Sequence, residues 1–177
     1  MPKSYDLDAA IRKVPDFPKP GILFYDITSI LMQPEAFSYC VAAMVDRYRE
    51  RDLTAIAAIE SRGFLFAAPA AHALGLPLIL VRKSGKLPGA TYRRTYELEY
   101  GTDTVEIHQA DIHSGDRILI VDDLVATGGT LRATAEMVSE IGAGVEEVFC
   151  VIGLPFLDYE RQLAPLHVET LITYDSE

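Results

Sequence analysis

Short runs of consecutive apolar residues alternate, along the middle of the chain, with longer stretches whose apolar residues recur at helical spacing. A run that is apolar at every position is typical of a parallel strand, because helices cover both faces of such a sheet. These runs predict strands at residues 54–59, 78–81, 118–121 and 147–152. The stretches before and between them predict helices at residues 34–51, 64–74 and 131–141. Such an alternation predicts an α/β fold with a doubly wound, mostly parallel sheet.

The alternation does not reach the two ends of the chain. Residues 15–21 are rich in proline and glycine, and residues 82–101 have the composition of a long loop or hairpin. With 177 residues the chain has the length of a single domain, and its two ends are expected to form a separate cap. We therefore expect one domain over residues 1–177, divided into an N-terminal segment 1–33, an α/β core 34–152 that carries loop 82–101, and a C-terminal tail 153–177.

The balance of charge narrows the classes of function. The formal net charge is −10 at pH 7, and an overall negative field repels the phosphates of nucleic acids and membrane surfaces. The chain has no signal-peptide pattern, and proline, glycine and histidine interrupt its longest apolar stretch, residues 64–81. We therefore expect a cytoplasmic protein that binds neither nucleic acid nor membrane, so that any anion site is a local exception.

Cysteine and histidine do not occur at the spacing of metal ligands. Cys40 and Cys150 lie far apart and outside any Cys-x-x-Cys pattern, so both are expected to be small buried side chains. The histidines are also scattered, and His72, within an apolar helical stretch, is expected to lie in the core. No metal site made of side chains is therefore predicted.

The strand predicted at residues 118–121 leads into the stretch with the most specific chemistry. Asp122 and Asp123 follow it, at the strand end where open α/β sheets bind ligands, and two carboxylates can accept hydrogen bonds from a vicinal diol. A loop of small residues comes next: Ala126, Thr127, Gly128, Gly129 and Thr130. Glycine allows close approach to the backbone, threonine adds hydroxyl donors, and a helix N-terminus favours an anion. A diol beside a phosphate indicates a ribose 5-phosphate. The alternative is that the two aspartates only cap the loop and the helix.

Two other segments predict a second anion site. Residues 60–63 follow another apolar strand and open another helix, so Arg62 should face the same crevice and can bind an anion bidentately. Segment 82–101 is locally positive within an acidic chain, and glycine and proline around Lys86 suit a hinged loop that closes over a polyphosphate. The alternatives are an exposed arginine beside a turn glycine and a basic hairpin in solvent.

These motifs together resemble the phosphoribosyl-diphosphate site of the type I phosphoribosyltransferases. Segments 17–28, 82–89 and 96–101, supported by 61–66, resemble the adenine-specific branch of that family. The resemblance runs in order from about residue 14 to residue 144. It implies the type I fold with a small N-terminal hood. It also implies a reaction in which adenine and phosphoribosyl diphosphate give AMP and pyrophosphate.

The resemblance further assigns the two anion sites. Asp122 and Asp123 would hold the ribose hydroxyls, and residues 126–130 would hold the 5-phosphate. The pyrophosphate would be held by four cations, Arg62, Arg82, Lys83 and Lys86.

The base would be bound by the hood segment 1–33. Phe24 would stack on adenine, while the backbone of Leu23 and Tyr25 would read its amidine edge. A 6-oxopurine presents the opposite pattern of donors and acceptors, so it would leave buried groups unpaired. Many relatives carry arginine where this chain has Tyr25, and any contribution from that arginine side chain is missing here.

Glu99 is the candidate for acid–base catalysis, with Arg62 and Lys86 also expected to act on the reaction. Displacement at C1 passes through an oxocarbenium-like state, so the protein needs cations on the leaving group and an acceptor for the purine proton. The family implies Mg²⁺ bound through phosphoribosyl diphosphate rather than through side chains, and a homodimer as the usual assembly. The alternative for Glu97 and Glu99 is a pair of solvated residues on a hairpin strand.

Two other functions stay open. A phosphoribosyltransferase for xanthine, guanine or hypoxanthine would have the same fold, and fold does not fix function. A regulator of this fold that senses phosphoribosyl diphosphate and binds nucleic acid should carry a basic face or an added DNA-binding domain. This sequence shows neither of those features.

Overall fold

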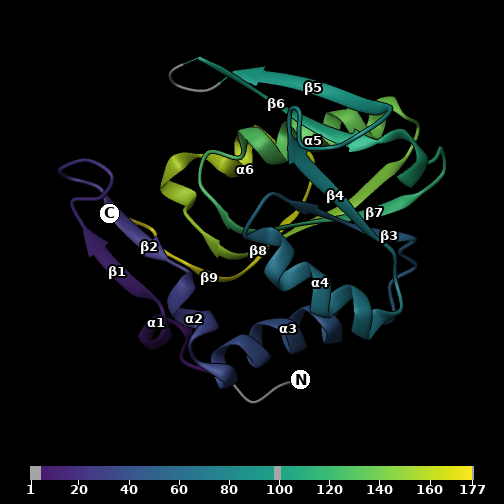
Figure 1. The fold of residues 1–177 in the computed structure, drawn as a ribbon. Coiled ribbons are helices and arrows are strands. Elements are labelled where there is room, and N and C mark those ends of the chain that lie inside the picture. The colour runs from purple at the N-terminus through teal and green to yellow at the C-terminus, as the bar shows by residue number, and fades with distance from the viewer. Residues whose placement is uncertain (1–4, 98–100, 177) are drawn as a thin grey trace.

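The computed structural model of the chain describes residues 5–97 and 101–176. Within these residues seven strands form the main sheet, in the order β5-β6-β4-β3-β7-β8-β9 (Figure 1). Their bounds are β3 Ala55–Ile59, β4 Leu78–Lys83, β5 Thr91–Glu97, β6 Thr102–His108, β7 Arg117–Val125, β8 Gly144–Gly153 and β9 Val168–Thr173. The five strands from β4 to β9 in that order pair in parallel, whereas β6 is antiparallel to β4 and β5 is antiparallel to β6. The predicted doubly wound, mostly parallel sheet is confirmed.

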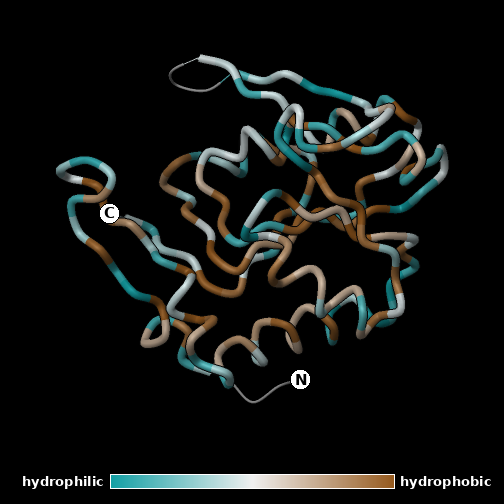
Figure 2. Tube along the Cα trace, viewed as in Figure 1, coloured by the Kyte–Doolittle hydropathy of each residue, from teal (hydrophilic) through white to brown (hydrophobic). Residues whose placement is uncertain are grey.

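Helices cover both faces of this sheet, because its central strands are apolar at every position. Ile56 and Ala58 of β3 join one core cluster, with α3 Pro34–Tyr48 and α4 Gly63–Leu74. Residues 55, 57 and 59 join the other cluster, with α5 Gly129–Glu140 and α6 Tyr159–Leu163. Side chains of a strand alternate between the two faces, so a strand buried on both sides must be apolar throughout. Figure 2 shows the most hydrophobic stretches of the chain gathered in these central strands.

The N-terminal segment forms a small hood beside the main sheet, as predicted. Strands β1 Arg12–Pro15 and β2 Leu23–Asp26 pair in a two-stranded antiparallel sheet, flanked by the short helices α1 Leu7–Ala10 and α2 Thr28–Leu31. Short 3₁₀ turns occur elsewhere in the chain, at η1 Gln109–Asp111 and η2 Pro155–Leu157.

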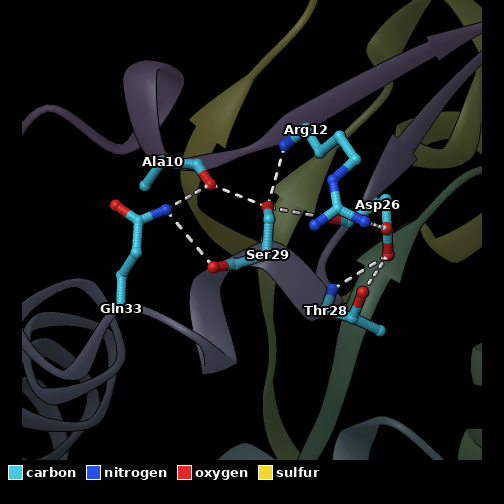
Figure 3. A network of polar contacts seen from close by, with 6 residues as sticks. All are labelled: Ala10, Arg12, Asp26, Thr28, Ser29 and Gln33. Atoms are coloured by element: carbon cyan, nitrogen blue, oxygen red, sulfur yellow. Dashed lines mark hydrogen bonds and ion pairs between the residues drawn. The ribbon is translucent and has the colours of Figure 1, made fainter.

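A polar network fixes the hood to the start of α3 (Figure 3). The Ser29 hydroxyl donates to the carbonyl of Ala10 at 2.7 Å and accepts from the backbone N–H of Arg12 at 2.8 Å. The Gln33 amide donates to the same Ala10 carbonyl at 3.0 Å. Ser29 is buried, and a buried hydroxyl with satisfied partners specifies one arrangement of the segments it joins. The hood strand β2 is therefore held in a defined position relative to the core.

Two strands of the main sheet, β9 and β6, were not predicted. The last 25 residues are not a tail outside the core, because β9 pairs with β8 as the edge strand of the main sheet. Strand β9 was missed because none of its residues is fully buried, as on an edge, and three of its side chains are polar: Glu169, Thr170 and Thr173. Segment 82–101 was predicted as a loop or hairpin, and its residues 91–97 form the hairpin strand β5, but the partner strand β6 was not predicted.

Single residues also test the expected core. Cys40 and Cys150 are both fully buried, as predicted. His72 is exposed, so its assignment to the core is wrong. It lies on the outer face of α4, whereas Phe66 and Ala70 on the other face are buried. In the part of the chain that the structure describes, no helix is both long and apolar enough to cross a membrane.

Candidate functional site

A cleft opens where the central strands end, and two adjoining cavities make it up. The first, of about 410 Å³, lies among the residues that follow β3, the end of β4 and the end of β7. The second, of about 510 Å³, lies along the loop between β7 and α5. Asp122, Leu124 and Thr130 line both cavities. The carboxyl ends of parallel strands are the usual ligand side of such a sheet, and the predicted crevice is formed there.

The second cavity is bordered mainly by the small residues of the loop between β7 and α5, with Asp122, Glu97 and Gln162 also in its lining. Helix α5 begins at Gly129, and its N-cap Gly128 has φ +84°. A Cβ on Gly128 would lie 3.2 Å from the side chain of Leu163, so this position has neither the conformation nor the space for a larger residue. The first N–H groups of α5 have no acceptor within the helix, and they make a ready site for an anion. All five residues of the predicted loop, 126–130, line this cavity.

Of the two predicted carboxylates, Asp122 lines both cavities and Asp123 lines the first. Strand β7 is longer than predicted, so Asp122 and Asp123 lie within it rather than after its end. Asp122 accepts a hydrogen bond from the backbone N–H of Asp123 at 2.8 Å. Removal from water raises the pKa of Asp122 well above its ordinary value, and the neighbouring charge of Asp123 raises it further. A ligand hydroxyl that donates a hydrogen bond to Asp122 would favour the ionised carboxylate and so lower this raised pKa.

The cations of the first cavity are each paired with a carboxylate. Arg62 donates through Nε to Asp123 at 2.5 Å, and Arg82 binds Glu60 through two hydrogen bonds of 3.2 and 3.1 Å. Lys83 lies 3.3 Å from Asp103. All six of these residues line the cavity. The positive charges predicted for an anion site are therefore assembled, but each has an acidic partner in the same wall.

Lys86 lies beside the first cavity rather than among the residues that line it. It is exposed in the turn after β4. Its charge contributes to lowering the pKa of Glu60, after the larger contributions of the Arg82 hydrogen bond and the Lys83 backbone N–H. Lys86 is therefore within electrostatic reach of the cavity wall. Glu99, the predicted acid–base group, lies outside the described residues.

Close packing at Gly63 brings the Arg62 segment against the carboxylates. A Cβ on Gly63 would lie 2.7 Å from the carbonyl oxygen of Val121 and 3.1 Å from the Cα of Asp122. Only glycine lets α4 begin this close to β7. Gly63 therefore serves the contact between helix and strand that brings Arg62 to the carboxylates.

The hood places β2 near the same cleft. Arg62 contributes to lowering the pKa of Asp26, after the larger contribution of the Thr28 hydroxyl, so the end of β2 is within electrostatic reach of Arg62. Phe24 is half-buried, and its ring meets that of Phe17 edge-on, with centroids 5.1 Å apart. Tyr25 is buried and stacks on Tyr174, with ring centroids 4.0 Å apart. Leu23, in the same strand, is half-buried.

Three side chains of the cleft had no predicted role. Tyr96, on β5, shares a hydrogen bond of 2.9 Å with the hydroxyl of Thr130 and lines the first cavity. Glu60 and Asp103 are the partners of Arg82 and Lys83. Asp103 and Tyr96 reach the cleft only through the pairing of β5 and β6, a non-local contact without a local signal. A polar residue directly after the apolar run 55–59 was the one available signal for Glu60.

Comparison with known proteins places the chain among close relatives. Residues 26–155 match the family described as "Phosphoribosyl transferase domain". The chain is 57% identical over 171 residues to the adenine phosphoribosyltransferase of Treponema denticola, which covers 97% of this chain and 90% of the relative.

Solved structures give the same result. The crystal structure of adenine phosphoribosyltransferase from Thermoanaerobacter pseudethanolicus superposes with a TM-score of 0.90 at 45% identity, covering 94% of this chain and 97% of that one. The Saccharomyces cerevisiae enzyme, complexed with an imino-altritol bisphosphate and adenine, superposes with a TM-score of 0.88 at 39% identity, covering 94% and 96%.

Proposed function

The chain belongs to the adenine phosphoribosyltransferases, within the phosphoribosyl transferase domain family, and from this premise we propose how its cleft divides the substrates. The reaction is that of purine salvage: the phosphoribosyl group passes from phosphoribosyl diphosphate to adenine, which gives AMP and pyrophosphate. The observation that carries the division is the position of Asp122 in the wall shared by both cavities. A helix N-terminus lies on one side of it and a set of cations on the other.

The ribose 5-phosphate lies along the second cavity. The 5-phosphate accepts from the backbone N–H groups and hydroxyls of residues 126–130, where the dipole of α5 also favours an anion. The ribose hydroxyls donate to Asp122 and Asp123. These hydrogen bonds favour the ionised carboxylates, and so they oppose the burial that raises the pKa of Asp122.

The pyrophosphate lies in the first cavity, against Arg62, Arg82, Lys83 and Lys86. Three of these cations have carboxylate partners, so diphosphate binding exchanges one anionic partner for another. An oxocarbenium-like transition state needs little covalent help, and stabilisation of the leaving group by positive charge is the main contribution of the protein.

The family implies Mg²⁺, and the donors of this cleft fit an ion that arrives with the substrate. Among the described residues no group of three histidine, cysteine, aspartate or glutamate side chains converges on one point. Mg²⁺ keeps several waters and commonly binds through one or two carboxylates together with phosphate oxygens. Asp122 and Asp123 are the carboxylates that would face it. When bound, the ion neutralises charge on the diphosphate.

Adenine lies against β2. Phe24 stacks on the base, and the backbone of Leu23 and Tyr25 reads its amidine edge, one C=O accepting from the amine and one N–H donating to the ring. The polar network around Ser29 supports this assignment, because it fixes the position of the strand. Backbone readout also leaves base selectivity independent of the side chain at position 25.

Glu99 accepts the purine proton in this proposal. Replacement by glutamine keeps the size of the side chain and removes the acceptor of the proton. We expect the Glu99→Gln variant to form AMP roughly 10²–10⁴-fold more slowly in single-turnover experiments, with unchanged affinity for phosphoribosyl diphosphate. Formation of AMP at the wild-type rate would show that Glu99 is only a loop carboxylate.

One assay separates this function from its alternatives. The protein is incubated with phosphoribosyl diphosphate, Mg²⁺ and adenine, hypoxanthine, guanine or xanthine in turn, and the nucleotide formed is measured. We expect AMP from adenine and little product from the 6-oxopurines, because they would leave buried backbone groups unpaired. Product mainly from a 6-oxopurine would contradict the base assignment. No product together with a DNA band shift would favour the regulator.

The assembly and the location of the enzyme stay predictions. We expect a homodimer, since two-fold dimers are the commonest oligomers, and sedimentation velocity tests this directly. An apolar groove of about 410 Å³ between α3 and α4 supports the expectation. A cytoplasmic location and the absence of nucleic-acid or membrane partners are likewise expected, in keeping with the net charge of −10.

A further inference from the structure

A fully buried carboxylate stands behind the Lys86 turn and has no part in the reaction described above. Glu106 lies in β6 and is 0% exposed. In the strand register it is opposite Arg82 of β4 on one side and Arg93 of β5 on the other. A buried charge is costly unless it is paired and hydrogen-bonded. Its presence at the centre of three strands therefore needs a reason.

The contacts of Glu106 connect two parts of the cleft, the turn after β4 and strand β5, through one side chain. Its Oε1 accepts from the backbone N–H groups of Lys86 and Leu87, both at 2.9 Å. Its Oε2 lies 3.2 Å from Nε of Arg93, which itself donates to the Thr91 hydroxyl. Oε2 therefore faces a positive charge but has no hydrogen bond among the described residues. The carboxylate joins the turn after β4 to the β5–β6 hairpin.

Lys83, at the start of the turn, is held by its pairing with β6 and by contacts with Glu60 and Asp103. Residues 84–86 are exposed, so the turn beyond Lys83 depends on backbone hydrogen bonds. The backbone N–H of Ser84 donates to Thr104 at 3.0 Å, and that of Lys86 is also 3.3 Å from the Lys83 carbonyl, a weaker contact than its bond to Glu106. The backbone N–H of Leu87, followed by that of Lys86 and the charge of Arg93, holds the pKa of Glu106 below its ordinary value. The acceptor is therefore charged, and its hydrogen bonds are the strong kind.

We propose that Glu106 is a positioning residue: it fixes the backbone at Lys86 so that the ammonium group is presented to the pyrophosphate side of the cleft. This inference rests on the proposed function, which assigns Lys86 to the pyrophosphate. Glu106 itself does not line the other cavity, along residues 126–130. Loss of its hydrogen bonds to the turn alone is therefore expected to leave binding in that cavity unchanged.

The test compares Glu106→Leu and Glu106→Gln with a matched control, Glu147→Gln. Glu147 is also a buried carboxylate, but it binds Arg47 and Tyr48 away from the cleft. Affinities for pyrophosphate with Mg²⁺ and for AMP are measured by calorimetry, beside thermal unfolding. We expect Glu106→Leu to bind pyrophosphate at least tenfold more weakly and AMP within twofold of wild type. Glu106→Gln keeps an acceptor for the turn and is expected to lose about threefold, whereas Glu147→Gln loses only stability.

Lys86→Ala distinguishes failure of the inference from failure of the proposed function. We expect it to weaken pyrophosphate binding, and we expect Glu106→Gln to add less than twofold in that background, because both changes act through one contact. Unchanged pyrophosphate affinity in Lys86→Ala would overturn the assignment of Lys86 and the inference with it. A loss in Lys86→Ala without any loss in the folded Glu106 variants would overturn the inference alone. An equal loss of AMP affinity in the Glu106 variants would also overturn it, and if Glu106→Leu does not fold, Glu106→Gln decides.

Discussion

The two cavities of the cleft are lined by different kinds of residues. The cavity along residues 126–130 is bordered mainly by one contiguous stretch of small, uncharged residues that leads into a helix N-terminus, and its charged lining residues are Asp122 and Glu97. The cavity beside it takes its charged residues from four separate segments, and Arg62, Arg82 and Lys83 are each paired with an acid. One half presents backbone donors that are ready for an anion. The other presents cations that must change partners.

This difference sets what each half contributes energetically. Backbone N–H groups at a helix start need no rearrangement to meet a phosphate. Exposed ion pairs such as Lys83–Asp103, whose lysine side chain is 63% exposed, contribute at most about 1 kcal/mol and are readily exchanged. Asp123 is only 4% exposed, so its pair with Arg62 is the costly one to separate. The first cavity therefore favours ligands that bring their own charge.

The largest effect is expected where the two halves meet. Asp122→Asn combined with Asp123→Asn removes charge-assisted hydrogen bonds to two ribose hydroxyls, each worth about 1.5–3 kcal/mol. AMP and phosphoribosyl diphosphate should therefore bind roughly 10²–10⁴-fold more weakly. Calorimetry with AMP measures this change, and thermal unfolding checks that the double variant is folded. Unchanged AMP affinity would contradict the assignment of the ribose hydroxyls to Asp122 and Asp123.

A substitution in the loop between β7 and α5 tests the cavity along residues 126–130, where backbone N–H groups are proposed to bind the phosphate. Gly128→Ala places a Cβ at φ +84° and within 3.2 Å of Leu163, which should shift the N–H groups at the start of α5. We expect AMP to bind about tenfold more weakly, equal to ~1.4 kcal/mol. Gly75→Ala is the matched control, because φ is +68° there with no atom nearby and the site lies at the far end of α4. Both variants should lose similar stability, and equal AMP affinity in the two would contradict the phosphate assignment.

A substitution at Lys86 tests the other cavity, where cations are proposed to bind the pyrophosphate. Lys86→Ala should lower kcat/KM about 10-fold or somewhat more, the loss of one charged hydrogen bond. AMP lacks the pyrophosphate, so its affinity should stay within twofold of wild type. Steady-state kinetics and AMP titration together measure the contrast. A parallel loss of rate and AMP affinity would show that Lys86 serves both halves.

The smallest expected effect is the release of a fraction of one proton when ribose 5-phosphate binds. The raised pKa of Asp122 contributes stability to the unliganded protein that is fully present below the ordinary aspartate range and is lost as pH rises through the raised value. A ribose diol donates to the carboxylate and favours its charged form, so binding of ribose 5-phosphate should release a proton in that pH window. Calorimetry in two buffers of different ionisation enthalpy measures the release. Asp122→Asn should lack this part of it, and an identical release in both proteins would contradict the shift.

The features that one contiguous stretch of residues encodes could be predicted from the sequence. Strand β7, the two aspartates and the loop before α5 follow one another, so their chemistry was visible before the fold. The parallel sheet was predictable for the same reason, because a strand buried on both faces is apolar throughout.

What depends on pairing between distant segments was not predictable. The partners of Arg82 and Lys83 come from the end of β3 and from β6. Glu106 looks like an ordinary polar residue of a strand until β6 is placed between β4 and β5. The roles assigned to Phe24 and Lys86 stay predictions, because they concern ligands.

The meeting of Tyr25 with Tyr174 has a consequence for how the enzyme is made. The Tyr174 hydroxyl donates to Asp8 at 2.7 Å, and Lys13 lies over its ring, so residues from both ends of the chain enclose β2 (Figure 1). During synthesis β2, which carries Tyr25, leaves the ribosome early, yet its packing partner Tyr174 is translated among the last residues. The nascent chain therefore can assemble its nucleotide loop well before its base-binding strand has a complete support. A fusion or tag placed directly after Tyr174 is therefore expected to weaken adenine binding more than binding of the 5-phosphate.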